Sequence, residues 1–127
     1  MQVRTLAAFR WMLALIALSF SGHVLADKAS MKADLIAARE RVVAIVSGQG
    51  DIAKLKPELR EISARIDKDA PTVPGFQAVW DKFKANRDGH IIPAYDGTMP
   101  DGKDAAKALA MGEQKQLYEQ MMGMLAQ

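Results

Sequence analysis

The chain has no cysteine among its 127 residues. It therefore forms no disulfide, offers no thiolate to a metal ion and attaches no haem through a C-x-x-C-H motif. Histidine occurs only as His23 and His90, and a lone imidazole without cysteine or a second histidine beside it does not make a zinc site. The stability of the fold must come from packing.

The chain also lacks a long apolar run. The most apolar stretch, residues 11–20, has about 10 residues, whereas a helix that spans a bilayer needs roughly 20. Arg4 and Arg10 precede it, and small residues follow it up to Ala26. This layout is typical of a secretory signal peptide, so we expect residues 1–26 to be cleaved after Ala26 on export to the periplasm. An uncleaved membrane anchor is the rival interpretation, and the short run argues against it.

Once this leader is removed, the remaining chain has no excess of positive or negative charge. Two of the 17 Lys+Arg and none of the 15 Asp+Glu fall within residues 1–26, which leaves 15 against 15 in residues 27–127. A neutral domain has no strong positive field, so we expect neither nucleic acid nor an anionic membrane surface as a partner. About 100 residues are enough for one domain with a modest core.

Strand-like alternation is absent, and four segments show helical periodicity instead. They extend over about 28–47, 52–68, 76–92 and 103–125. In the first two segments the apolar positions recur at alternating steps of three and four, which predicts nearly aligned helices. These positions are Met31, Leu35, Ala38, Val42 and Ile45, then Leu55, Leu59, Ile62 and Ile66.

Glycine and proline mark the ends of the first two segments. The glycines of residues 48–50 follow the first one, where a left-handed residue is favoured. Pro57 fits the first turn of a helix, so we expect the second helix to begin there or at Ile52. The run 70–75, with two prolines and a glycine, separates it from the third.

The last two segments are less regular. We expect Pro93 to end or kink the third. Gly112 and Glu113 interrupt the fourth, at a cost of roughly 1 kcal/mol for the glycine alone. The residues that share one side are Phe76, Val79, Trp80, Phe83, Arg87, His90 and Ile91 in the third segment, and Ala106, Leu109, Leu117, Met121 and Met124 in the fourth.

Four helices with short connections imply antiparallel neighbours. The sequence therefore predicts an all-α fold in which residues 27–127 form an up-down-up-down four-helix bundle about 30 Å long. Both ends of this domain then lie at one end of the bundle.

The predicted arrangement of the four helices does not favour a metal or cofactor site. Met31 and His90 fall at opposite ends of such a bundle, so a haem of the b-type cytochrome kind cannot join them. Asp96, Asp101 and Asp104 flank a glycine-containing loop, but their spacing matches no calcium-binding loop, and Asp-Gly pairs are common in turns. We expect no metal site and no cofactor.

Catalytic motifs are missing too. Ser30, Ser47 and Ser63 are expected as cap or surface residues, and His90 has no partner nearby in sequence, so we expect neither catalytic residues nor enzymatic activity. The methionines of residues 121–124 suit either an adaptable binding surface or core packing, and we favour the core. We expect Trp80 and Phe83 to be core residues as well.

A family resemblance lies in the second half of the chain. The stretches FQAVWDKFKANRDGHIIPAYDG and DGKDAAKALAMGEQKQLYEQMMGML, within residues 76–125, resemble helices 3 and 4 of the periplasmic four-helix-bundle sensory domain of bacterial methyl-accepting chemotaxis receptors. The matching positions are Trp80, Phe83, Arg87, Asp88, Ile91, Ile92, Gly97, Ala105, Ala106, Leu109 and Tyr118.

This resemblance implies a turn at RDGHIIPAYDG, residues 87–97, in which Ile91 and Ile92 close the core while Pro93 and Gly97 reverse the chain. It implies a soluble periplasmic sensory or ligand-binding module without the transmembrane signalling parts of the receptors. Its partner would be a small-molecule ligand or a membrane receptor, and a homodimer is compatible with the small core.

The ligand-binding residues stay unassigned at this point. The receptors bind small anions at their dimer interface through arginines of helix 1, and Arg39 and Arg41 lie on the first helix here. No family motif surrounds them, so this role is not transferred. The alternative function is a small periplasmic electron-transfer or metal-handling bundle of the cytochrome type that uses the methionine-rich end.

Overall fold

The computed structural model describes residues 23–127, with side chains from Lys28 onward. The predicted signal peptide therefore lies almost wholly outside the described residues. The elements in chain order are α2 (His23–Val46), α3 (Ile52–Asp69), the 3-10 turn η1 (Ala70–Thr72), α4 (Phe76–Asn86), the π-helical segment η2 (Arg87–Ile91), α5 (Ile92–Asp96), α6 (Gly102–Met111) and α7 (Glu113–Leu125). No strand occurs in this part of the chain, which confirms the all-α class.

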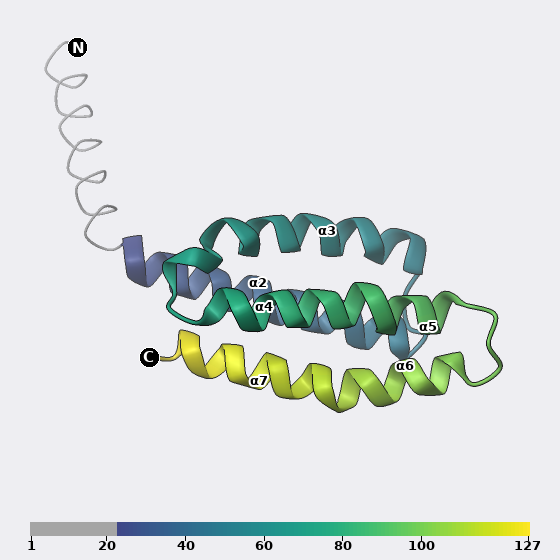
Figure 1. The fold of residues 1–127 in the computed structure, drawn as a ribbon. Coiled ribbons are helices and arrows are strands. Elements are labelled where there is room, and N and C mark those ends of the chain that lie inside the picture. Colours follow the sequence, from purple (N-terminus) through teal and green to yellow (C-terminus); the bar gives the residue numbers. More distant parts are fainter. Residues whose placement is uncertain (1–22) are drawn as a thin grey trace, which may run out of the picture.

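These elements form four antiparallel rods (Figure 1). The first two rods are α2 and α3. The third joins α4, η2 and α5, and the fourth joins α6 and α7. Near the start of α2, Lys28 Nζ donates a hydrogen bond of 2.9 Å to the backbone oxygen of Gln127. The two ends of the domain therefore meet, as an up-down-up-down four-helix bundle requires. Within residues 23–127, no helix is both long enough and apolar enough to cross a membrane.

The core follows the periodicity of the sequence. All five seam positions of α2 are buried, and Trp80 stacks on Phe83 with ring centroids 5.5 Å apart. Met121 is fully buried, while Met122 and Met124 pack partly buried against the core. The predicted packing role of the methionines is confirmed. The largest fully buried side chains are Trp80, Phe76, Phe83, Met31, Leu35, Ile45, Ile66, Ile91, Met121, Gln114 and Val42.

Helix α3 begins at Ile52, the earlier of the two expected positions. Asp51 caps it, because its Oδ1 accepts a hydrogen bond of 3.1 Å from the backbone N–H of Ala53. This cap satisfies one of the free N–H groups of the first turn. The expectation that the helix begins at Pro57 is wrong, since the proline lies inside the helix.

Residues 87–96 are not a turn, and the expectation that Pro93 reverses the chain is wrong, whereas Gly97 lies in the connection to α6 as expected. Helix α4 continues through η2 into α5, and the chain leaves the helix only after Asp96. The N–H of Ile92 donates to the carbonyl of Arg87, five residues earlier, which is the hydrogen bond of a π turn. Pro93 does not end the rod, because it stands in the first turn of α5.

The wider π turn changes which side chains face inward. Arg87 and Ile91 are both buried, whereas Gly89 and His90 project outward between them. His90 was expected on the same side as Ile91, and this expectation is wrong because His90 is exposed. Ile91 closes the core as predicted, with Ile92 half-buried beside it.

The fourth rod breaks where the sequence indicates. Gly112, with φ of −101° and ψ of −102°, separates α6 from α7. Glu113 is exposed after the break, and the buried polar position is taken by Gln114. The interruption therefore leaves no carboxylate in the core at this point.

Candidate ligand-binding groove

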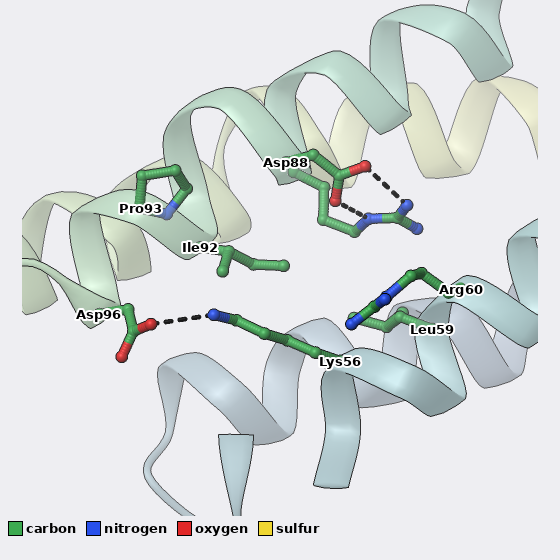
Figure 2. Close-up of a pocket in the computed structure, with 8 residues that line it drawn as sticks. Lys56, Leu59, Arg60, Asp88, Ile92, Pro93 and Asp96 are labelled. Atoms are coloured by element: carbon green, nitrogen blue, oxygen red, sulfur yellow. Dashed lines mark hydrogen bonds and ion pairs between the residues drawn. The ribbon is translucent and has the colours of Figure 1, made fainter. Parts of the chain in front are cut away.

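A half-open cavity of about 360 Å³ lies between α3 and the segment formed by η2 and α5 (Figure 2). The lining residues of α3 and those of η2 and α5 are about 30 positions apart in the sequence. Between them the chain turns back through η1 and α4, which brings the two groups side by side. The groove is lined by Lys56, Leu59 and Arg60 of α3, and by Arg87, Asp88, Ile92, Pro93 and Asp96.

The groove exists because the backbone of α3 lies farther from the third rod than from α2. Helix α3 packs closely along α2, whereas its backbone approaches α4, η2 and α5 much less. Side chains bridge this wider gap, and several of them are polar. The bridging pairs are Lys56 with Asp96, Ser63 with Arg87, and Asp67 with both Trp80 and Lys84.

Arg87 is the most unusual residue at the groove, because its guanidinium is buried with only 3% of the residue exposed. Its Nε and Nη2 donate hydrogen bonds of 2.8 and 3.1 Å to the two carboxylate oxygens of Asp88. Its Nη1 donates to Ser63 Oγ at 2.9 Å, and the guanidinium carbon lies 6.0 Å from the centre of the Trp80 ring. These partners compensate the cost of burying the charge.

Ser63 was expected at the surface or in a cap, and this expectation is wrong. It is buried on α3, where its Oγ accepts the hydrogen bond from Arg87 Nη1. The buried arginine on the apolar side of the third segment was visible in the sequence, whereas its partner on another helix was not.

Asp67 forms a second polar bridge, farther along α3. Its Oδ1 accepts hydrogen bonds of 2.6 Å from Trp80 Nε1 and from Lys84 Nζ. Desolvation by burial, the largest single influence, acts to raise the pKa of Asp67, but the hydrogen bonds from Lys84 and Trp80 and the positive charges of Lys84 and Arg87 together lower it. The carboxylate is therefore held ionised between α3 and α4.

The charges around the groove are unevenly paired. Lys56 Nζ lies 2.9 Å from Asp96 Oδ2, and Arg87 pairs with Asp88. Arg60 makes no ion pair with any described residue, and Figure 2 shows it reaching toward the groove from α3 without a bonded partner. The groove thus offers one unpaired cation beside the apolar surface of Leu59 and Ile92.

Of the other candidate residues from the sequence, only Asp96 lines the groove. Met31 is buried, while His90 is exposed on η2. Of the three loop aspartates, Asp96 bonds to Lys56, and Asp101 and Asp104 are exposed. Across residues 23–127, no group of three or more His, Cys, Asp or Glu is arranged to hold a metal ion.

The two arginines of the first helix are partly buried and contact residues of other helices. Arg39 Nη1 donates to the carbonyl of Ala110 at 2.6 Å, and its guanidinium stands over the ring of Tyr118. Arg41 Nε lies 3.3 Å from Glu58 Oε2. Neither arginine lines the groove.

Sequence reasoning also missed a buried amide pair. Asn86 Nδ2 donates to Gln114 Oε1 at 2.9 Å, and Gln114 Nε2 donates to the carbonyl of Phe83 at 3.3 Å. This pair ties α4 to α7 through the core. A polar residue within an otherwise apolar stripe is the only signal that the sequence gives for it.

Comparison with known proteins adds no relative: no family model, no curated protein and no solved structure matches the chain.

Proposed function

We propose that the protein is a small-molecule-binding module of the sensory type that acts in the periplasm. The observation that supports this proposal is the groove of about 360 Å³ beside the π-helical segment. Small-molecule sites have volumes of roughly 300 to 1,000 Å³ and combine apolar walls with a few polar groups. Single π turns inside helices are frequent at functional sites.

The resemblance to the chemoreceptor sensory domain supports the same proposal. Arg87, Asp88 and Ile92 belong to the positions that carry this resemblance, and all three line the groove. A ligand placed between α3 and the third rod contacts two elements whose backbones are otherwise well separated. Binding there changes the spacing of the two rods, which is the kind of change that a partner receptor can detect.

Thermal unfolding in the presence of a broad panel of metabolites tests the proposal. A ligand that binds only the folded protein stabilises it by RT ln(1 + [L]/Kd), or about 2.7 kcal/mol at a hundredfold excess over Kd. We expect at least one compound to raise the Tm, and we expect Ile92→Trp, which fills the groove, to remove the rise.

Ala85→Trp is the matched control, since Ala85 is exposed on α4 and does not line the groove. It should keep the ligand-induced rise in Tm. No stabilising compound, or a rise that Ile92→Trp leaves intact, would contradict a ligand site in the groove.

A further inference from the structure

The pairing of charges at the groove indicates what it prefers to bind. Three cations and two carboxylates line it. Lys56 and Arg87 each have a carboxylate within hydrogen-bond distance, which leaves Arg60 as the cation without one among the described residues. A guanidinium presents two parallel N–H groups, and this geometry matches a carboxylate.

The surroundings of Arg60 favour an anion with an apolar body. Leu59, Ile92 and Pro93 supply the apolar wall next to the charged groups. Lys56 also lies at the groove, and its ammonium has three donors, of which Asp96 accepts one at 2.9 Å. A carboxylate bound to Arg60 therefore finds a second cation on the same face of α3, one helical turn away.

The two aspartates limit the charge of the ligand. Asp88 and Asp96 neutralise Arg87 and Lys56, so the groove as a whole carries one net positive charge. A second negative charge on the ligand meets these carboxylates and is disfavoured by repulsion. An ammonium group finds both carboxylates already paired and meets the free charge of Arg60 instead.

We infer that the groove selects small monocarboxylates with a compact aliphatic body, and that Arg60 determines this specificity. The inference rests on the proposed function, because it names the ligand class of the same groove. Arg60 is exposed and packs into no part of the core, so its replacement tests ligand recognition without loss of the fold.

Three probes with the same aliphatic body separate charge from shape. They are 4-methylpentanoate, its uncharged amide 4-methylpentanamide, and the cationic isopentylamine. The readout is the NMR signal of the Ile92 side-chain methyl group at the groove, titrated in the full-length protein. We expect the carboxylate to shift this signal at a Kd at least tenfold lower than that of the amide, and the amine to bind more weakly still.

Two variants assign the effect to Arg60. In Arg60→Gln the carboxylate should lose at least tenfold in affinity and bind no better than the amide, whose own affinity stays unchanged. Lys68→Gln is the matched control, because Lys68 is an exposed cation in the last turn of the same helix and does not line the groove. It should leave all three affinities unchanged.

The possible failures are distinguishable. Equal affinities for the carboxylate and the amide, or a carboxylate affinity that survives Arg60→Gln, would overturn the anion specificity while a ligand site in the groove remains supported. If none of the three probes shifts the Ile92 signal, the monocarboxylate specificity is overturned, while the metabolite panel with Ile92→Trp decides separately whether the groove binds a ligand.

Discussion

Individual polar residues inside this bundle are satisfied by partners on other helices. Arg87 reaches Ser63 across the gap to α3, and Asn86 reaches Gln114 on α7. In the described part of the chain, no buried side-chain nitrogen or oxygen lacks a hydrogen-bond partner. Because removal of one partner leaves the other buried and unpaired, each of these residues can be tested alone.

The buried amide of Gln114 is the first test. Gln114→Met keeps a similar volume but leaves Asn86 Nδ2 without its acceptor, so we expect the free energy of unfolding in urea to fall by about 1–3 kcal/mol. Gln116→Met makes the same change at an exposed position of α7 and should cost less than about 0.5 kcal/mol. Equal losses in the two variants would show that the buried hydrogen bond contributes nothing.

The carboxylate of Asp67 gives a pH test. Its pKa is lowered in the folded state, so its stabilising contribution is present above the unfolded pKa of about 3.9 and is lost as the pH falls through the folded pKa. We expect the free energy of unfolding to decline below about pH 4, and Asp67→Asn to lower it at pH 7 and to flatten this decline.

The control for Asp67 is Asp101→Asn, since Asp101 is exposed and caps no N–H group with its side chain. Its denaturation profile against pH should keep the shape of the unchanged protein. A carbon-detected NMR titration that placed the Asp67 pKa at or above 3.9 would refute the assignment directly.

The sequence predicts the apolar residues of the core much better than the polar ones. Met31, Trp80 and Phe83 are buried as their spacing indicates, because a helical stripe is a local property. The partnership of Ser63 with Arg87 depends on the axial register of two helices, which no local pattern encodes. The groove lies at this same junction, and for this reason none of its lining residues was predicted as a ligand contact.

At the scale of elements, the junction of α5 and α6 depends on a glycine. Gly102 is buried at the start of α6, and a Cβ atom added there would clash with the carbonyl oxygen of Ala94. Gly89 of η2 has open space at its Cβ position. These two glycines therefore have opposite responses to the same substitution.

We expect Gly102→Ala to destabilise the protein by about 1–3 kcal/mol, because the backbone of α5 must move. Gly89→Ala should instead stabilise it by up to about 1 kcal/mol through the helix propensity of alanine. Thermal unfolding of both variants measures the difference. A gain in Tm for Gly102→Ala would contradict the close contact of the two helices.

Pro57 is the other element-scale test. It lies inside α3, where a proline removes one backbone hydrogen bond and costs up to about 3 kcal/mol. We expect Pro57→Ala, at an exposed position, to raise the free energy of unfolding by about 1–3 kcal/mol. Pro71→Ala in the first turn of η1 should give no gain, since proline is favoured there. Equal changes in the free energy of unfolding for the two variants would mean that Pro57 does not destabilise α3.

Element boundaries were predictable where a residue type determines the backbone locally. Gly48, with φ of 68°, ends α2, and Gly112 breaks the fourth rod, both as the sequence indicates. The π turn at residues 87–91 was not predictable. Arg87 and Ile91 are buried there while His90 is exposed, and no residue type in the segment specifies this wider turn.

The whole molecule should unfold in one step despite the weakly packed side of α3. Trp80, the single tryptophan of residues 27–127, is fully buried and bonds through its Nε1 to Asp67 of α3, so its fluorescence reports the contact between α3 and α4. Far-ultraviolet circular dichroism reports all four rods together. For a domain of this size we expect the two urea transitions to coincide, at a free energy of unfolding of about 5–15 kcal/mol. If α3 separates first, the fluorescence transition precedes the loss of helix, and the bundle then consists of a stable three-rod core with a detachable α3.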